Sequence, residues 1–272
     1  MKAYLSLIRI DLKLAFRNRS VIFFNYLFPL MFFFIFAQMM GAVVPISYVV
    51  GMVLVLGILG NGLFGAGMRA VNEREANILR RYKVAPITAT PLLVSSMVTG
   101  WVAFMPSAIL ILSIAHFRYK MTFPAHMLSL LGLISLGVIT FRSMGLIIAA
   151  VVNSMQEGNI LIQLLYMPML FLSGATFPVE RLPRWGQIVS HFLPASHLVT
   201  GFRGIFQEDQ SLFENWPSVL ALITTLTICT FVATQLFRWE KEEKIRTSAK
   251  LWVLGALAPF VILGCYQIFA AP

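Results

Sequence analysis

The sequence predicts an all-α protein that is integral to a membrane. Hydrophobic residues make up 58% of the 272 residues, charged residues only 12%, and the mean hydropathy is +0.82. Soluble domains carry about a quarter charged residues, and a helical span needs about 20 mostly apolar residues. Apolar runs of roughly that length recur along the chain and are the predicted spans: 21–41, 46–68, 92–115, 127–152, 160–177, 216–237 and 251–271. We therefore expect one transmembrane domain over residues 1–272, with no sizeable soluble domain.

The net charge of +10 is distributed unevenly between the two sides that these spans define. Lys and Arg near span ends orient a membrane protein, with the excess on the cytoplasmic side. If the N-terminus is cytoplasmic, that side holds most of them, in 2–19, 69–83 and 238–250. The opposite side holds only Arg118, Lys120, Arg181, Arg184 and Arg203. The basic charge therefore indicates topology and no nucleic-acid partner, and a spanning 251–271 puts the C-terminus outside.

Residues 1–20 predict an interfacial helix ahead of the first span. Leu5, Ile8 and Leu12 recur at helical spacing, while Arg9 and Lys13 occupy the other face. Such a helix lies in the headgroup plane with its basic side toward anionic lipid. The alternative is a basic flank that only orients the first span.

Small residues fill the second run. Gly57, Asn61 and Gly65 fall four residues apart and so form one helical stripe, which lets another helix approach closely. The stripe indicates either helix packing or the lining of a pathway, and packing at a subunit interface would satisfy both. We group Asn25 of the first run with these pathway or dimer-interface candidates.

The segment 71–90 predicts an amphipathic helix on the cytoplasmic side. Asn72 is a candidate N-cap, acidic residues follow it and basic residues come later, an order that complements the helix dipole. Such a helix indicates a docking element for a partner, although a plain solvated helix also fits. The turn at 153–158 should return to the same side and touch the same partner. The candidate docking residues are Glu73, Arg74, Glu75, Arg80, Arg81, Tyr82, Pro86, Gln156 and Glu157.

Arg142 lies well inside the fourth apolar run. A charge there is costly, so an intramembrane ionisable residue is by default a candidate for function. A structural pairing with carbonyls, or with an Asn or Gln on a neighbouring helix, is an equally good interpretation.

The fifth run breaks at Ser173 and Gly174, and prolines then punctuate short amphipathic pieces over 178–206. At membrane depth, irregular backbone is tolerated only where protein or a water-filled cavity covers its polar groups. The charge asymmetry puts this segment on the outer side, so we interpret it as a re-entrant gate. Its candidate residues are Ser173, Gly174, Pro178, Pro183, Trp185, Pro194 and Arg203.

Motifs for catalysis, metal binding and nucleotide binding are missing from the sequence. It contains no GxxxxGK[ST] phosphate loop, no HExxH and no metal-ligand spacing. Carboxylates are also absent from the apolar runs, which disfavours a proton- or sodium-driven carrier. We expect a transport protein without a catalytic site of its own. An ATP-independent channel or secondary carrier is the alternative, and an intramembrane enzyme is a weaker one.

Three stretches resemble the permease subunits of type-two ABC exporters, a superfamily of drug-resistance, lipid and polysaccharide exporters. Residues 1–20 are similar to the family's elbow helix, and NEREANILRRYKVAPITATPLL is similar to its coupling helix. The most specific match is PMLFLSGATFPVERLPRWGQIVSHFLPASHLVTGFR, which is similar to the end of the family's fifth span and its signature. The family usually has six spans, so 251–271 is an extra one, and Arg142 is not part of the family pattern.

The resemblance implies a working model for this chain. Two permease copies or homologues would pair around a pathway and bind separate ATPase subunits, which would hold ATP and Mg. The second and fifth spans would line the pathway, with Gln163, Tyr166 and Met167 among the lining residues. We expect export of an amphipathic, lipid-like or drug-like substrate across a bacterial-type cytoplasmic (inner) membrane.

Overall fold

The computed structural model describes residues 2–17, 22–41, 43–79 and 88–240, and helices without any strand make up its regular structure in those ranges. Within them, four helices are long and apolar enough to cross a membrane: Ile46–Glu75, Ala89–Tyr119, Met127–Val151 and Trp216–Gln235. The prediction of an all-α integral membrane protein is confirmed. The predicted run at 251–271 lies outside the described residues.

The predicted first span consists of two consecutive helical pieces, the π-helix η1 (Phe23–Leu27) and α3 (Phe28–Met40). The helix α1 (Lys2–Arg17) precedes it. Pro29 has no N–H to donate to the carbonyl four residues back. The backbone N–H of Phe28 instead reaches the carbonyl of Phe23, five residues back, so the helix widens before the proline.

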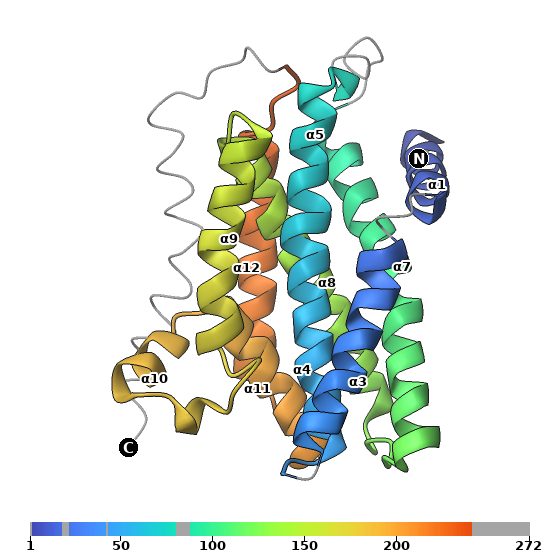
Figure 1. The fold of residues 1–272 in the computed structure, drawn as a ribbon. Coiled ribbons are helices and arrows are strands. Elements are labelled where there is room, and N and C mark those ends of the chain that lie inside the picture. Colours follow the sequence, from blue (N-terminus) through green and yellow to red (C-terminus); the bar gives the residue numbers. More distant parts are fainter. Residues whose placement is uncertain (1, 18–21, 42, 80–87, 241–272) are drawn as a thin grey trace.

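The predicted second span is longer than the apolar run suggests. α4 (Ile46–Leu59), the π-helix η2 (Gly60–Met68) and α5 (Arg69–Glu75) form one continuous rod through the molecule (Figure 1). The prediction that Asn72 caps a new helix is therefore wrong. The rod continues because Val71 and Arg74 are buried against neighbouring helices, and it ends where Asn77 takes the left-handed φ of 56°.

α8 (Met127–Val151) is the central helix of the bundle, between the rod, α7 (Ala89–Tyr119) and α12 (Trp216–Gln235). One side of it packs on η2 at backbone contact distance, because glycines stand on both helices. A Cβ on Gly62 would lie 2.5 Å from the backbone of Phe141, and a Cβ on Gly145 would lie 2.3 Å from the carbonyl oxygen of Gly62. This contact fixes the rod against the core.

The fifth predicted span is α9 (Met155–Leu172), which ends with Ser173 as its C-cap and Gly174 at a φ of +88°. Short elements follow: η3 (Val179–Arg181), α10 (Arg184–Ser190) and α11 (Pro194–Gln207). In Figure 1, α10 and α11 lie at the opposite end of the bundle from α5. We refer to these two ends as the α5 end and the α11 end.

Candidate functional site

Ion pairs and a hydrogen bond join three helices at the α5 end, α1, the rod and α7. Arg69 donates from Nη2 to Asp11 of α1 at 2.6 Å and from Nε to Glu73, one turn further along its own helix, at 2.7 Å. The hydroxyl of Ser95 on α7 donates to the other oxygen of Asp11 at 2.7 Å. A single carboxylate thus ties α1 to both the rod and α7.

Arg74 connects the same end of the rod to the last turn of α8. Its side chain is 3% exposed, and its two terminal nitrogens donate to the carbonyl oxygens of Ala149 at 2.6 Å and Val152 at 2.5 Å. Arg238, after α12, also donates to the Val152 oxygen and bonds Asn153 Oδ1 at 3.0 Å. Two guanidinium groups therefore satisfy carbonyls that end α8 without helical partners.

The start of α9 is fixed by Ser154 as the N-cap and by the carboxylate of Glu157, which bonds the residue before the cap. The backbone N–H of Glu157 donates to the Ser154 hydroxyl at 3.2 Å, and the Glu157 carboxylate accepts from the N–H of Asn153 at 2.8 Å. Glu75 reaches across from α5 and accepts the N–H of Met155 at 2.9 Å. The rod, α8 and α9 thus meet in one hydrogen-bonded corner.

The predicted docking residues take different positions at this end. Gln156 and Glu157 are exposed, Glu73 and Glu75 are half-buried in the contacts above, and Arg74 faces the interior. Direct contact of the Arg74 side chain with a partner is therefore excluded by its burial, and any part it has in docking is indirect. The remaining candidates lie outside the described residues: Arg80, Arg81, Tyr82 and Pro86.

A cavity of about 1010 Å³, here called the inner cavity, opens beside the rod. It is lined by residues of α1, η1, α3, the rod (α4, η2 and α5), α7, α8 and α9, most of them apolar. Of the predicted pathway residues, five line it: Asn25, Gly57, Asn61, Gly65 and Tyr166. Gln163 and Met167 do not line it, because they lie on the exposed side of α9.

Arg142 also lines the inner cavity, although only 3% of it is exposed. Its Nη1 donates to the carbonyl oxygen of Asn61 at 3.2 Å and to the Asn61 side-chain oxygen at 2.9 Å, and its Nη2 donates to Ser96 at 3.0 Å. The Asn61 amide nitrogen in turn donates to Asn25 at 3.1 Å. The pairing with an Asn and a carbonyl, one of the two predicted interpretations, is present.

Sequence reasoning missed the residues that make room for this arginine. A Cβ on Gly100 would lie 2.1 Å from the Arg142 guanidinium, so a larger residue there would displace the guanidinium from this position. It also missed the closest helix contact, which uses Gly62 and Gly145 and not the Gly57–Asn61–Gly65 stripe. The π-turns of η2 change which residues face α8, and the 3.6-residue period used to define the stripe does not hold there.

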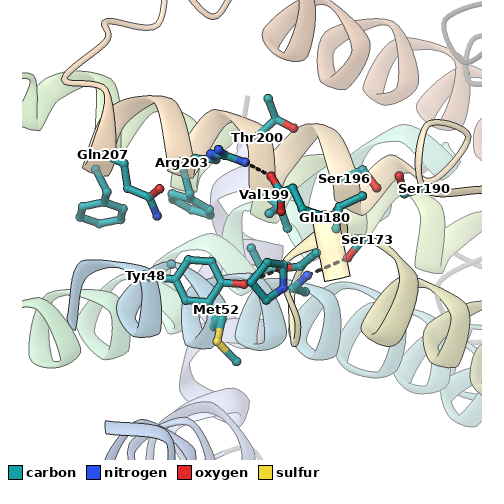
Figure 2. A pocket seen from close by; sticks show the side chains of 18 of the residues that line it. Tyr48, Met52, Ser173, Glu180, Ser190, Ser196, Val199, Thr200, Arg203 and Gln207 are labelled. Carbon is teal, nitrogen blue, oxygen red and sulfur yellow. Dashed lines mark hydrogen bonds and ion pairs between the residues drawn. The ribbon is translucent and has the colours of Figure 1, made fainter. Parts of the chain in front are cut away.

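A second cavity of about 660 Å³, the outer cavity, lies at the α11 end between α4, the break after α9, and α11. Figure 2 shows Arg203 reaching from α11 to Glu180 of η3, with Tyr48 of α4 nearby. Arg203 Nη1 lies 2.5 Å from Glu180 Oε1, and the Tyr48 hydroxyl donates to the carbonyl oxygen of Gly174 at 3.4 Å. A backbone hydrogen bond and then the bond from Arg203 hold the pKa of Glu180 below its ordinary value.

Four of the predicted gate residues line the outer cavity: Ser173, Gly174, Pro178 and Arg203. The others lie away from it. Pro183 precedes α10, Pro194 is the first residue of α11, and Trp185 is 61% exposed. Tyr48 and Glu180 were missed, although the opposite charges of Glu180 and Arg203 on either side of the proline-rich turns were a usable signal. In the described ranges, no group of three His, Cys, Asp or Glu residues is placed to hold a metal ion.

Comparison with known proteins identifies the family of this chain. The family model described as ABC-2 type transporter matches residues 2–207. The chain is 24% identical over 171 residues to the probable multidrug ABC transporter permease YbhR of Escherichia coli (strain K12), covering 63% of this chain and 46% of that protein. It is 22% identical over 205 residues to YbhS of the same organism, also named a probable multidrug ABC transporter permease, covering 75% and 50%.

Nodulation protein J of Rhizobium leguminosarum bv. trifolii is 34% identical over 108 residues, which cover 40% of this chain and 41% of that protein. The chain thus spans about half the length of the curated relatives it matches. No solved structure matches it significantly. Because the family model covers both cavities and the corner at the α5 end, this chain belongs to the ABC-2 type transporter family.

Proposed function

We propose that the chain is the membrane-spanning permease subunit of an ATP-driven exporter. It moves an amphipathic, lipid-like or drug-like substrate out of the cytoplasm or inner leaflet, and separate ATPase subunits that bind ATP and Mg supply the energy. The α5 end faces the cytoplasm in this proposal, and the α11 end faces outward. A second permease, identical or homologous, completes the pathway.

One observation carries the proposal: the last residues of the rod, Arg69–Glu75, are bonded to several of the helices that line the inner cavity. Arg69 and Glu73 line the cavity and also form the ion pairs that hold α1. Arg74 and Glu75, which follow directly, hold the end of α8 and the start of α9. In this proposal, a displacement of the end of the rod therefore acts on α1, α8 and α9.

The test is association with an ATPase subunit that carries a GxxxxGK[ST] loop. The chain and that subunit are co-expressed and purified through a tag on the permease. The double variant Arg80→Glu, Arg81→Glu reverses two charges of the proposed docking segment. We expect it to lose most of the bound ATPase while the permease itself is extracted and elutes as a folded protein.

The matched control reverses two charges at the other end of α7, where Arg118 and Lys120 are both exposed. The Arg118→Glu, Lys120→Glu variant should retain the ATPase. Full retention of the ATPase by the Arg80, Arg81 variant would disprove docking through this segment. Solute movement by the purified chain alone in liposomes, without ATP, would instead favour a channel or carrier.

A further inference from the structure

The inner cavity contains a positively charged side chain, Arg142, that no carboxylate of the described residues contacts directly. All the hydrogen-bond partners of Arg142 in that part of the chain are uncharged: Asn61 and Ser96. The acidic residue in the cavity lining is Glu73, and it is paired with Arg69. Burying a charge without a counter-ion is costly, and such residues in membrane proteins mark binding sites or ion pathways.

Two buried polar atoms beside this charge also have no partner in the described ranges. One is Nε of Arg142 and the other is the hydroxyl oxygen of Thr99. Both residues line the inner cavity, and Thr99 is 2% exposed. Nη2 of Arg142 makes one bond to Ser96 and so retains a second N–H. The wall thus offers several unused hydrogen-bond donors around one positive charge.

The rest of the cavity suits an apolar chain. Aromatic and aliphatic side chains surround the polar cluster, among them Phe28, Phe32, Phe64 and Val53. The cavity volume of about 1010 Å³ is at the upper end of the range for small-molecule pockets. It therefore leaves room for a ligand tail beyond the head group that would contact Arg142. An acid head with an apolar tail matches both parts of this lining.

We propose that the inner cavity binds an anionic amphiphile whose carboxylate or phosphate head pairs with Arg142 and Thr99, and whose tail lies along the phenylalanines. Guanidinium binds such oxyanions through charge-assisted, often bidentate, hydrogen bonds. A cationic head is disfavoured there, because the charge of Arg142 would repel it. As a substrate assignment, this inference rests on the proposed export function.

The binding itself is tested on the full chain in neutral detergent, without any ATPase. The probes share an oleoyl tail: lysophosphatidic acid, which is anionic, and lysophosphatidylcholine, which is zwitterionic. Inorganic phosphate is the probe without a tail. We expect lysophosphatidic acid to raise the apparent unfolding temperature of the wild-type chain by about 2–4 °C more than either of the others.

Arg142→Gln should abolish this preference, and Lys120→Gln, which removes an exposed charge at the other end of α7, should keep it. Thr99→Val is a second variant that does not endanger folding, because the hydroxyl it removes makes no hydrogen bond within the described part of the chain. We expect it to reduce the preference for lysophosphatidic acid.

Equal shifts with the anionic and zwitterionic lipids would overturn the proposal. So would loss of the preference in Lys120→Gln, or an equal shift with phosphate alone. Because no ATPase is present, these outcomes are independent of the docking test, and each proposal can fail without the other.

Discussion

Different kinds of contact stabilise the two ends of the bundle. At the α5 end, charged side chains are largely buried and bond to backbone groups, as Arg74 does with the end of α8 and Glu75 with the start of α9. At the α11 end, short helices are joined by turns, and the ion pair of Arg203 with Glu180 has side chains 50% and 60% exposed. Buried charge-assisted bonds therefore hold the α5 end, whereas the ion pair at the α11 end is exposed to solvent and contributes little to stability.

The largest effect is expected from breaking the corner at the α5 end with Arg74→Met. The substitution removes two charge-assisted hydrogen bonds from a buried site, each worth about 1.5–3 kcal/mol. We expect destabilisation of about 3 kcal/mol or more, measured as a fall in the apparent unfolding temperature in detergent. Arg184→Met, which changes an exposed residue of α10, should have almost no effect. If Arg74→Met lowers the unfolding temperature only slightly, the buried bonds at the α5 end contribute no more to stability than the exposed ones at the α11 end.

Gly62→Ala tests the contact that joins the rod to the core between the two ends. The new Cβ would lie 2.5 Å from the backbone of Phe141, so backbone must move. Overpacking of this kind costs about 1–3 kcal/mol. Gly60→Ala is the matched control on the same π-helix, because nothing lies within 4 Å of its added Cβ. Equal stability of the two alanine variants would contradict the described packing.

Ser154→Ala removes the side-chain N-cap of α9 and should cost about 1 kcal/mol. Gln156→Ala, two residues further on at an exposed position, should leave the unfolding temperature unchanged. Comparison of the two also separates stability from docking. If Gln156→Ala reduces ATPase co-purification without changing stability, the turn contributes a docking contact of its own.

The smallest effect is expected from Glu180→Gln at the α11 end. Exposed ion pairs contribute less than about 1 kcal/mol and weaken with salt. The pKa of Glu180 is lowered in the folded protein, so its stabilising contribution is present above the ordinary pKa of glutamate. That contribution is lost as the pH falls through the lowered pKa. The unfolding temperatures of wild type and Glu180→Gln should therefore differ slightly at pH 7 and low salt, and converge at acidic pH or high salt.

The sequence predicted the fold class and the principal helices well, because bilayer thickness imposes long apolar runs that composition alone reveals. It also singled out Arg142, since a charge in such a run is conspicuous. Its surroundings were not predictable in detail. Ser96, which bonds Arg142, and Gly100, which leaves space for it, are both ordinary residues for a packed span. The Asn72 cap failed for a related reason, since burial of Val71 and Arg74 by other helices keeps the rod helical beyond the apolar run.

The glycine stripe shows where pattern reasoning stops. It assumed a uniform α-helical period, but the nine residues Gly60–Met68 form a π-helix, and the facing residues become Gly62 and Gly67. Local propensity does not indicate such a departure, because it depends on the partner helix. The docking segment is a different case, since four of its candidate residues lie outside the described ranges and remain predictions.

The π-helix η2 also sets the rotational phase of everything beyond it. An α-helix turns about 100° per residue, so removing one residue from Gly60–Met68 would swing Arg69 and Arg74 around the rod axis by about that angle. Arg69 would then point away from Asp11, and Arg74 away from the end of α8. The alignment of the α5 end therefore depends on the exact number of residues in the π-helix that precedes it.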